Sequence, residues 1–251
     1  MPYLKRDGWE LFYREMGDGP LLIILPGNTS SSACHRGELE FFGRWYRAVS
    51  LDFRGTGQSG RMDPWPMDWW EASADDVGAL IQHLGGDEEA IVMGTSGGGV
   101  IALKTAIRSP AVVKAVVADS CMGKVPPGWV DRLLAERGAE TPEQVGFWSF
   151  AHGEDWRPVV DGDSDLLRRF GEAGGDWFGD TLAAIRCPVL LTASLRDGAL
   201  PGVGPQVAEM VEQIPRGEAH LFHTGDHPLM WTRPEAFRRV VLSFLEEREN
   251  L

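Results

Sequence analysis

Cysteine is scarce in this chain, which has three cysteines among 251 residues. Cys34, Cys121 and Cys187 form no C-x-x-C pair. A small, odd set of cysteines argues against a disulfide framework and is typical of proteins that work in a reducing compartment. The sequence therefore predicts a cytoplasmic protein without structural disulfides.

Long apolar runs and positive charge are also lacking. No apolar stretch approaches the ~20 residues that a membrane helix needs, and residues 1–10 lack the basic start and apolar core of a signal peptide. Lys and Arg number 24 against 37 Asp and Glu, which gives a net charge of −13. A surface of this sign repels nucleic acid and anionic membranes, so neither is expected as a partner.

Segments of strand and helix character alternate through the first half of the chain and again near its end. Such alternation predicts an α/β fold, in which helices flank a mostly parallel sheet on both faces. Period-two and buried-type apolar segments predict strands at 9–16, 21–25, 47–52, 90–93, 112–118, 188–193 and 220–223. Apolar residues at helical spacing predict helices at 74–84, 100–107, 207–214 and 234–247.

Residues 121–180 interrupt this alternation. They are rich in Gly, Pro, Asp and Trp, and only short helical pieces such as 130–137 are expected there. We interpret this segment as a lid inserted into a core made of residues 1–120 and 181–251. Because ligands of open α/β sheets bind at the carboxyl ends of the strands, chemistry is expected in the loops that follow strands.

The loop after the strand at 90–93 carries the pattern G-x-S-x-G, in residues 94–98. A strand, a sharp turn and a helix around this pattern are typical of a nucleophile elbow, which holds the serine hydroxyl above the sheet. Short motifs also arise by chance, and a glycine-rich helix start with an incidental serine is the plain alternative. The flanking strand and helix favour Ser96 as a nucleophile.

A serine nucleophile needs a base to take its proton and an acid to orient that base. Among six histidines, His227 lies in the loop between the last strand and the last helix. Asp197 follows the strand at 188–193 and is the predicted acid, with Asp119 as the alternative. Asp226 is set aside, because neighbouring side chains rarely face each other.

The strand at 21–25 leads into Pro26-Gly27-Asn28-Thr29. A tetrahedral intermediate needs backbone N–H groups aimed at its developing negative charge. One such group is expected from Gly97, the residue after the nucleophile, and the second from Asn28.

Taken together, these motifs resemble the α/β-hydrolase superfamily over nearly the full length of the chain. Residues 52–59 read D-x-R-G-x-G-x-S, as in many lid-bearing members. Residues 225–227 and 234–237 resemble the family's histidine loop and final helix, and residues 188–197 resemble its acid-bearing strand and loop. The resemblance implies a lid-bearing serine hydrolase of the carboxylesterase-like branch.

The chain also departs from its relatives in places. Many carry His-Gly where this chain has Pro26-Gly27, and a glycine where it has Asp226. Epoxide hydrolases and haloalkane dehalogenases use an aspartate nucleophile, so the serine at position 96 argues against both.

Tryptophan is abundant, with ten residues in the chain. Trp148, Trp156 and Trp177 lie in the predicted lid, and aromatic walls suit an apolar pocket. These three are the expected substrate-binding residues, and the expected partner is a small molecule with an apolar acyl or alcohol part. Core packing of the rings is the alternative for each of them.

The sequence predicts an enzyme that hydrolyses carboxylic esters or related acyl compounds without a cofactor or a metal ion. A carbon–carbon bond hydrolase, an aminopeptidase and a cofactor-free perhydrolase are alternatives on the same three residues. A non-catalytic small-molecule receptor is an alternative of another class. Residues 55–60 also fit G-x-G-x-x-G of dinucleotide-binding oxidoreductases, but Pro64 and Pro66 prevent the helix that should follow.

Overall fold

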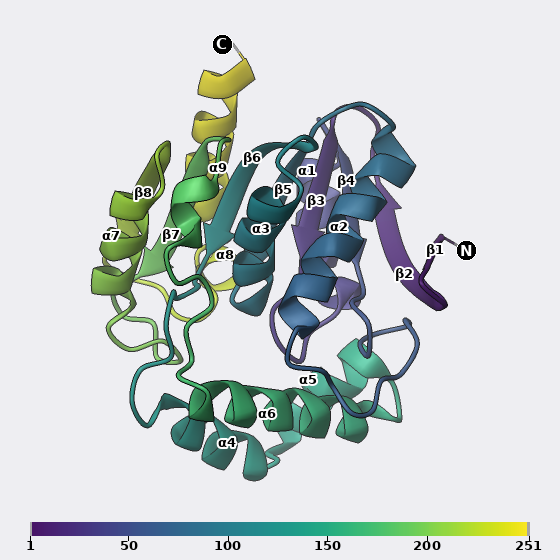
Figure 1. Cartoon of the computed structure of the whole chain (residues 1–251), viewed down its shortest axis with the longest axis vertical. Coiled ribbons are helices and arrows are strands. Elements are labelled where there is room, and N and C mark those ends of the chain that lie inside the picture. The colour runs from purple at the N-terminus through teal and green to yellow at the C-terminus, as the bar shows by residue number, and fades with distance from the viewer. Residues whose placement is uncertain (1, 250–251) are drawn as a thin grey trace.

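The computed structural model describes residues 2–249, and an eight-stranded sheet forms its centre (Figure 1). The strands are β1 (Tyr3–Arg6), β2 (Trp9–Met16), β3 (Leu21–Leu25), β4 (Arg47–Leu51), β5 (Ala90–Thr95), β6 (Val113–Asp119), β7 (Val189–Ser194) and β8 (Gly217–Phe222). Their order across the sheet is β1-β2-β4-β3-β5-β6-β7-β8. β1, β2 and β4 pair antiparallel, and every pair from β4 to β8 is parallel.

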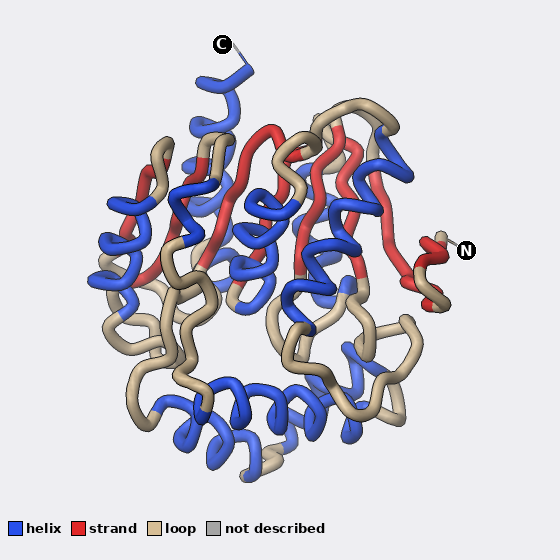
Figure 2. Tube along the Cα trace, in the orientation of Figure 1, coloured by secondary structure: helices blue, strands red, loops and turns tan. Residues whose placement is uncertain are grey.

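Helices cover both faces of the sheet, as Figure 2 shows in blue against the red strands. On one face lie α2 (Trp69–Gly85), α3 (Gly97–Arg108) and α7 (Val203–Gln213). On the other lie α1 (Arg36–Phe42), α8 (Leu229–Thr232) and α9 (Pro234–Glu249). Each face buries its own apolar cluster, so β3 is buried along its whole length and carries apolar residues only. The predicted α/β fold with a mostly parallel sheet is confirmed.

Three helices are inserted between β6 and β7: α4 (Trp129–Gly138), α5 (Pro142–His152) and α6 (Trp156–Glu172). They lie beyond the carboxyl ends of the parallel strands, below the sheet in Figure 1. The segments that enter and leave the insertion pair with each other, because Val125 N–H donates to Gly175 O at 2.7 Å and Trp177 N–H to Gly123 O at 3.1 Å. We propose residues 121–180 as the extent of this lid.

The expectation of only short helical pieces in the lid was wrong for α6, which has 17 residues. Its sequence carries an exposed Pro158, a half-buried Gly162 and a buried Asp163, and these residues weaken an apolar helical pattern. The strand β1, the short helix α1 and the 3-10 turns η1 (Ser32–His35) and η2 (Thr181–Ala184) were also not predicted. Within residues 2–249, no helix combines the length and the apolar composition needed to cross a membrane.

The loop with the pattern D-x-R-G-x-G-x-S is held by the carboxylate of its first residue. Asp52 is buried and accepts hydrogen bonds from Ser32 N–H and Gln58 N–H, both at 2.7 Å. Gly57 has a φ of +51°, and a Cβ there would lie 2.0 Å from Asp52 Oδ2. The second glycine of the pattern is therefore required by the closeness of this carboxylate.

The structure of the same loop argues against a dinucleotide-binding motif. In a dinucleotide-binding motif the third glycine opens a helix, and nearby N–H groups are free for the pyrophosphate. Here α2 begins at Trp69 rather than at Gly60, and the N–H groups of Gly57 and Gln58 already donate to side chains. The loop is a structural turn.

A buried histidine anchors the lid to the loops beneath it. His152, the last residue of α5, accepts a hydrogen bond from Gly57 N–H at Nδ1 (2.9 Å) and donates from Nε2 to Thr29 O (3.1 Å). Arg61 donates to His152 O at 2.8 Å and pairs with Asp155 at 2.7 Å. The bond that Nδ1 accepts requires neutral imidazole with its proton on Nε2, and burial lowers the pKa of His152 from 6.5 to about 4.

This anchor predicts that the protein loses stability in mild acid. Because the pKa of His152 is lower in the folded than in the unfolded chain, its stabilising effect is present above pH 6.5 and is lost as the pH falls toward 4. Between pH 7 and pH 5 the loss is about 2 kcal/mol. In urea denaturation, the free energy of unfolding should fall less between pH 7 and pH 5 for His152→Gln than for the wild type. The amide of Gln can accept and donate hydrogen bonds in the same places but does not titrate.

The exposed His220 supplies the matched control. His220→Gln should keep the acid dependence of the wild type. An equal pH dependence for His152→Gln and wild type would show that His152 does not carry this effect.

Candidate active site

Ser96 occupies a sharp turn between β5 and α3. Its φ of +54° and ψ of −125° lie in a region that a non-glycine residue adopts only at a cost of roughly 1–3 kcal/mol. Ser96 N–H is held by Asp119 O at 2.8 Å. A Cβ on Gly94 would lie 2.1 Å from Gly98 O, and one on Gly98 would lie 2.3 Å from Leu25 O. Glycine at 94 therefore allows β5 and α3 to meet so closely, and glycine at 98 allows α3 to pack against the end of β3.

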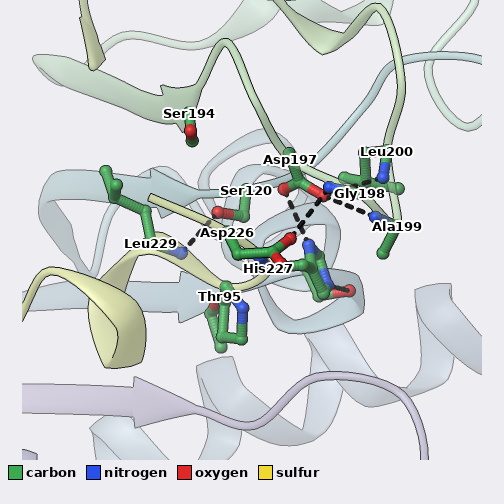
Figure 3. Close-up of polar contacts among 12 residues, drawn as sticks. Thr95, Ser120, Ser194, Asp197, Gly198, Ala199, Leu200, Asp226, His227 and Leu229 are labelled. Carbon is green, nitrogen blue, oxygen red and sulfur yellow. Dashed lines mark hydrogen bonds and ion pairs between the residues drawn. The ribbon is translucent and has the colours of Figure 1, made fainter. Parts of the chain in front are cut away.

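The structure brings His227 and Asp197 to this serine. His227 Nε2 lies 3.1 Å from Ser96 Oγ, and His227 Nδ1 lies 2.9 Å from Asp197 Oδ2. Figure 3 shows the imidazole pointing at the carboxylate, which follows β7. The other oxygen of Asp197 accepts from the N–H groups of Ala199 (3.0 Å) and Leu200 (2.8 Å). Both carboxylate oxygens are thus satisfied, and this side chain is fully buried.

Asp119, the alternative for the acid, is engaged elsewhere. Its oxygens accept hydrogen bonds from Thr192 Oγ1 (2.7 Å), Thr95 Oγ1 (3.0 Å) and Met230 N–H (3.0 Å). Burial raises the pKa of this carboxyl to about 6, although the three hydrogen bonds oppose the shift. Asp119 thereby ties β5, β6 and β7 to the segment that follows His227.

Asp226 has a positioning contact that sequence reasoning missed. One of its oxygens accepts from His227 N–H (2.8 Å) and from Gly198 N–H (2.9 Å), and these bonds lower the pKa of Asp226. The side chain therefore links the histidine loop to the loop that carries Asp197, as Figure 3 shows. Its replacement of the glycine found in relatives was the available signal.

Asn28 and Gly97 lie against each other beside Ser96. A Cβ on Gly97 would lie 3.3 Å from Asn28 N and 1.8 Å from Asn28 Oδ1. Within residues 2–249, neither backbone N–H donates a hydrogen bond to another residue. Two N–H groups next to the serine are therefore available to a ligand oxygen.

Comparison with known proteins gives the family. The model of the alpha/beta hydrolase family matches residues 22–240. The chain belongs to the alpha/beta hydrolase family.

Relatives and solved structures agree with this membership. A protein of Agrobacterium fabrum named "Putative carbamate hydrolase RutD" is 27% identical over 257 residues, which cover 94% of this chain and 97% of that protein. A crystal structure of a hydrolase from Pseudomonas aeruginosa superimposes with a TM-score of 0.78 at 22% identity, with 97% of both chains covered. A thermophilic esterase from Thermogutta terrifontis gives 0.78 at 19% identity, covering 98% of this chain and 97% of the esterase.

In this member of the family, a cavity of about 30 Å³ opens beside Ser96. Its walls are mostly apolar: Asn28, Ser96, Gly97, Val100, Ser120, Cys121, Met122, Trp129, Leu167, Trp177 and Leu200. Trp177, one of the three tryptophans predicted to bind substrate, lines this cavity, and its role in binding stays a prediction. Trp129 also lines it, and its ring N–H is fixed by Ala199 O at 2.7 Å.

The two other predicted tryptophans lie elsewhere. Trp148 and Trp156 stack on each other, with ring centroids 5.1 Å apart, and form a small lid core with Val160. The expectation that they line the pocket is corrected, because each ring is buried by its neighbours in the lid. Tryptophan content alone does not distinguish a pocket wall from a core.

Proposed function

We propose that this protein hydrolyses carboxylic esters and related acyl compounds through an acyl-enzyme formed on Ser96. The observation that carries the proposal is the row of hydrogen bonds from Ser96 to His227 to Asp197, with the serine on a strained turn above the sheet. Family membership supports it. An imidazole oriented by a buried carboxylate is what a serine nucleophile needs, which favours an enzyme over a non-catalytic receptor.

In the proposed reaction His227 Nε2 takes the proton of Ser96 while Oγ attacks the carbonyl carbon. Negative charge develops on the carbonyl oxygen, where the N–H groups of Asn28 and Gly97 would stabilise it. Asp197 holds the imidazole in the required tautomer and stabilises its cation. His227 then protonates the leaving alcohol, activates a water molecule, and the acyl-enzyme is hydrolysed.

The cavity beside Ser96 supports a short acyl group. Pockets for drug-sized ligands measure roughly 300–1,000 Å³, whereas this cavity measures about 30 Å³. The buried side chains of Leu167 and Trp177 close it on the lid side. We therefore favour substrates with acyl groups of few carbons, and with any bulk on the leaving-group side.

Carbamates are the second candidate substrate class, favoured by the relatives. Several proteins named as putative carbamate hydrolases match more than nine-tenths of this chain at 23–27% identity. A carbamate presents the same carbonyl to Ser96 and needs the same stabilisation of its oxyanion. Comparing kcat/KM for matched carbamates and short-chain esters separates the two classes.

Replacement of Ser96 tests the nucleophile. Treatment with a fluorophosphonate should add one adduct to the wild type and none to Ser96→Ala, as measured by intact mass. Ser96→Ala and His227→Ala should each lower kcat by about 10⁴-fold or more. Ser243→Ala, which alters an exposed serine of α9, is the control and should behave as wild type. Near-normal turnover by Ser96→Ala would refute the mechanism.

Asp197 and Asp119, the two candidates for the acid, should respond differently to loss of charge. Asp197→Asn should lower kcat by about 10⁴-fold, because an amide favours the wrong tautomer of the histidine. Asp119→Asn should stay within about tenfold of wild type, since Asp119 contacts the backbone of Met230 and two threonines rather than the imidazole. Steady-state kinetics with one ester decides between them, and a collapse confined to Asp119→Asn would reverse the assignment.

Acyl length tests the size of the cavity. On a series of p-nitrophenyl esters, kcat/KM should be highest for acetyl or propionyl and fall by about 10-fold or more for hexanoyl. Leu167→Ala removes a wall and should move the optimum to longer chains, whereas Val160→Ala, in the lid core, should not. An unchanged preference in Leu167→Ala would show that this cavity does not hold the acyl group.

A further inference from the structure

The side chain of Asn28 is held between the nucleophile turn and the lid. Its amide oxygen lies over Gly97, where a Cβ would approach it to 1.8 Å, so only glycine leaves room for it. Its amide nitrogen donates to Asp163 Oδ1 at 2.5 Å. The orientation of this side chain is thus fixed at both ends.

Asp163 comes from α6 of the lid and is almost completely buried. Its second oxygen pairs with Arg137 of α4 at 2.7 Å, and Arg137 also donates to Ser164 Oγ at 2.8 Å. From the core, Asn28 donates a hydrogen bond to Asp163. A buried carboxylate is costly unless it is paired and hydrogen-bonded, and here both conditions hold.

Other lid contacts reach the same loop. His152 donates to Thr29 O at 3.1 Å, and Ser31 Oγ donates to Ala151 O at 2.7 Å. These two bonds fix the loop after Asn28. The contact of Asp163 is made instead to the residue whose N–H faces the position of the oxyanion in the proposed reaction.

We infer that Asp163 is a positioning residue, which aims the Asn28 N–H at the oxyanion through the side chain of Asn28. The inference rests on the proposed function, because the direction of this N–H matters only if an oxyanion forms at Ser96. Arg137 has a linked role. A carboxylate next to a developing negative charge opposes it, and the guanidinium of Arg137 neutralises that carboxylate.

Single and paired variants test the link between Asp163 and Asn28. Asp163→Ala and Asn28→Ala should each lower kcat by about 10- to 100-fold, within the range for loss of an oxyanion donor, while KM changes little. The double variant should be no worse than either single variant, because both remove the same contact. Asp163→Asn keeps an acceptor for Asn28 and should stay within about threefold of wild type.

A second pair of variants tests whether Arg137 neutralises the carboxylate of Asp163. Arg137→Met leaves the carboxylate of Asp163 unpaired and should lower kcat, and adding Asp163→Asn should restore it. Asp165→Asn is the matched control, since Asp165 lies on the same helix but pairs with Arg168 and Arg169 at the surface. Thermal unfolding of every variant shows whether the lid remains folded.

A trifluoromethyl ketone gives a readout that a purely structural role would not change. Ser96 Oγ adds to its carbonyl carbon, the proton passes to His227, and the carbonyl oxygen becomes an oxyanion. The inhibition constant should rise in Asp163→Ala by the same factor by which kcat/KM falls. Additive losses in the double variant, or a rise in KM alone, would overturn the inference.

Failure of the inference is distinguishable from failure of the proposed function. If the wild type reacts with fluorophosphonate at Ser96 and hydrolyses esters, but Asp163→Ala does so equally well, only the inference fails. If the wild type does neither, the proposed function fails.

Discussion

The left-handed turn at Ser96 is the constraint on which the site depends. β5 and α3 approach so closely there that glycine is required at 94, the end of β3 requires glycine at 98, and the serine has a φ of +54°. Two neighbouring loops at the same sheet edge also hold a non-glycine residue with a positive φ, namely Thr29 (+55°) and Ser120 (+48°). Such conformations persist only where surrounding contacts enforce them. Here the three residues lie in loops that follow strands of the sheet, and these loops surround the proposed reaction site.

The carboxyl edge of the sheet was the most predictable part of the molecule. Buried apolar segments identified the parallel strands from β3 to β7, whereas β8 is largely exposed. The loops after β5, β7 and β8 hold Ser96, Asp197 and His227 within hydrogen-bonding distance. The acid was less certain, because Asp119 also follows a strand. What separates the two carboxylates is their partners: hydroxyl groups and a backbone N–H for Asp119, and the imidazole for Asp197.

Other features depend on tertiary contacts that no local pattern carries. Trp148, Trp156 and Trp177 all lie in the segment predicted as the lid. Of these three, Trp177 lines the cavity, whereas Trp148 and Trp156 pack in the lid core. His35, which ends η1 after a run of serine residues, is completely buried, and burial lowers its pKa to about 4. The lid is bonded to the core by buried polar side chains from α5 and α6, each matched to a loop far away in sequence. These pairings become visible only in three dimensions.

The proposed mechanism requires Ser96 to carry a covalent acyl group during turnover. The most direct measurement is to quench the reaction of a short-chain ester with acid in the steady state, digest with pepsin and determine the mass of the peptide that contains Ser96. If the mechanism holds, a fraction of this peptide should be heavier by the mass of the added acyl group, and this fraction should be larger for esters whose acyl-enzyme is hydrolysed slowly. Turnover with the acyl group on another residue would contradict it.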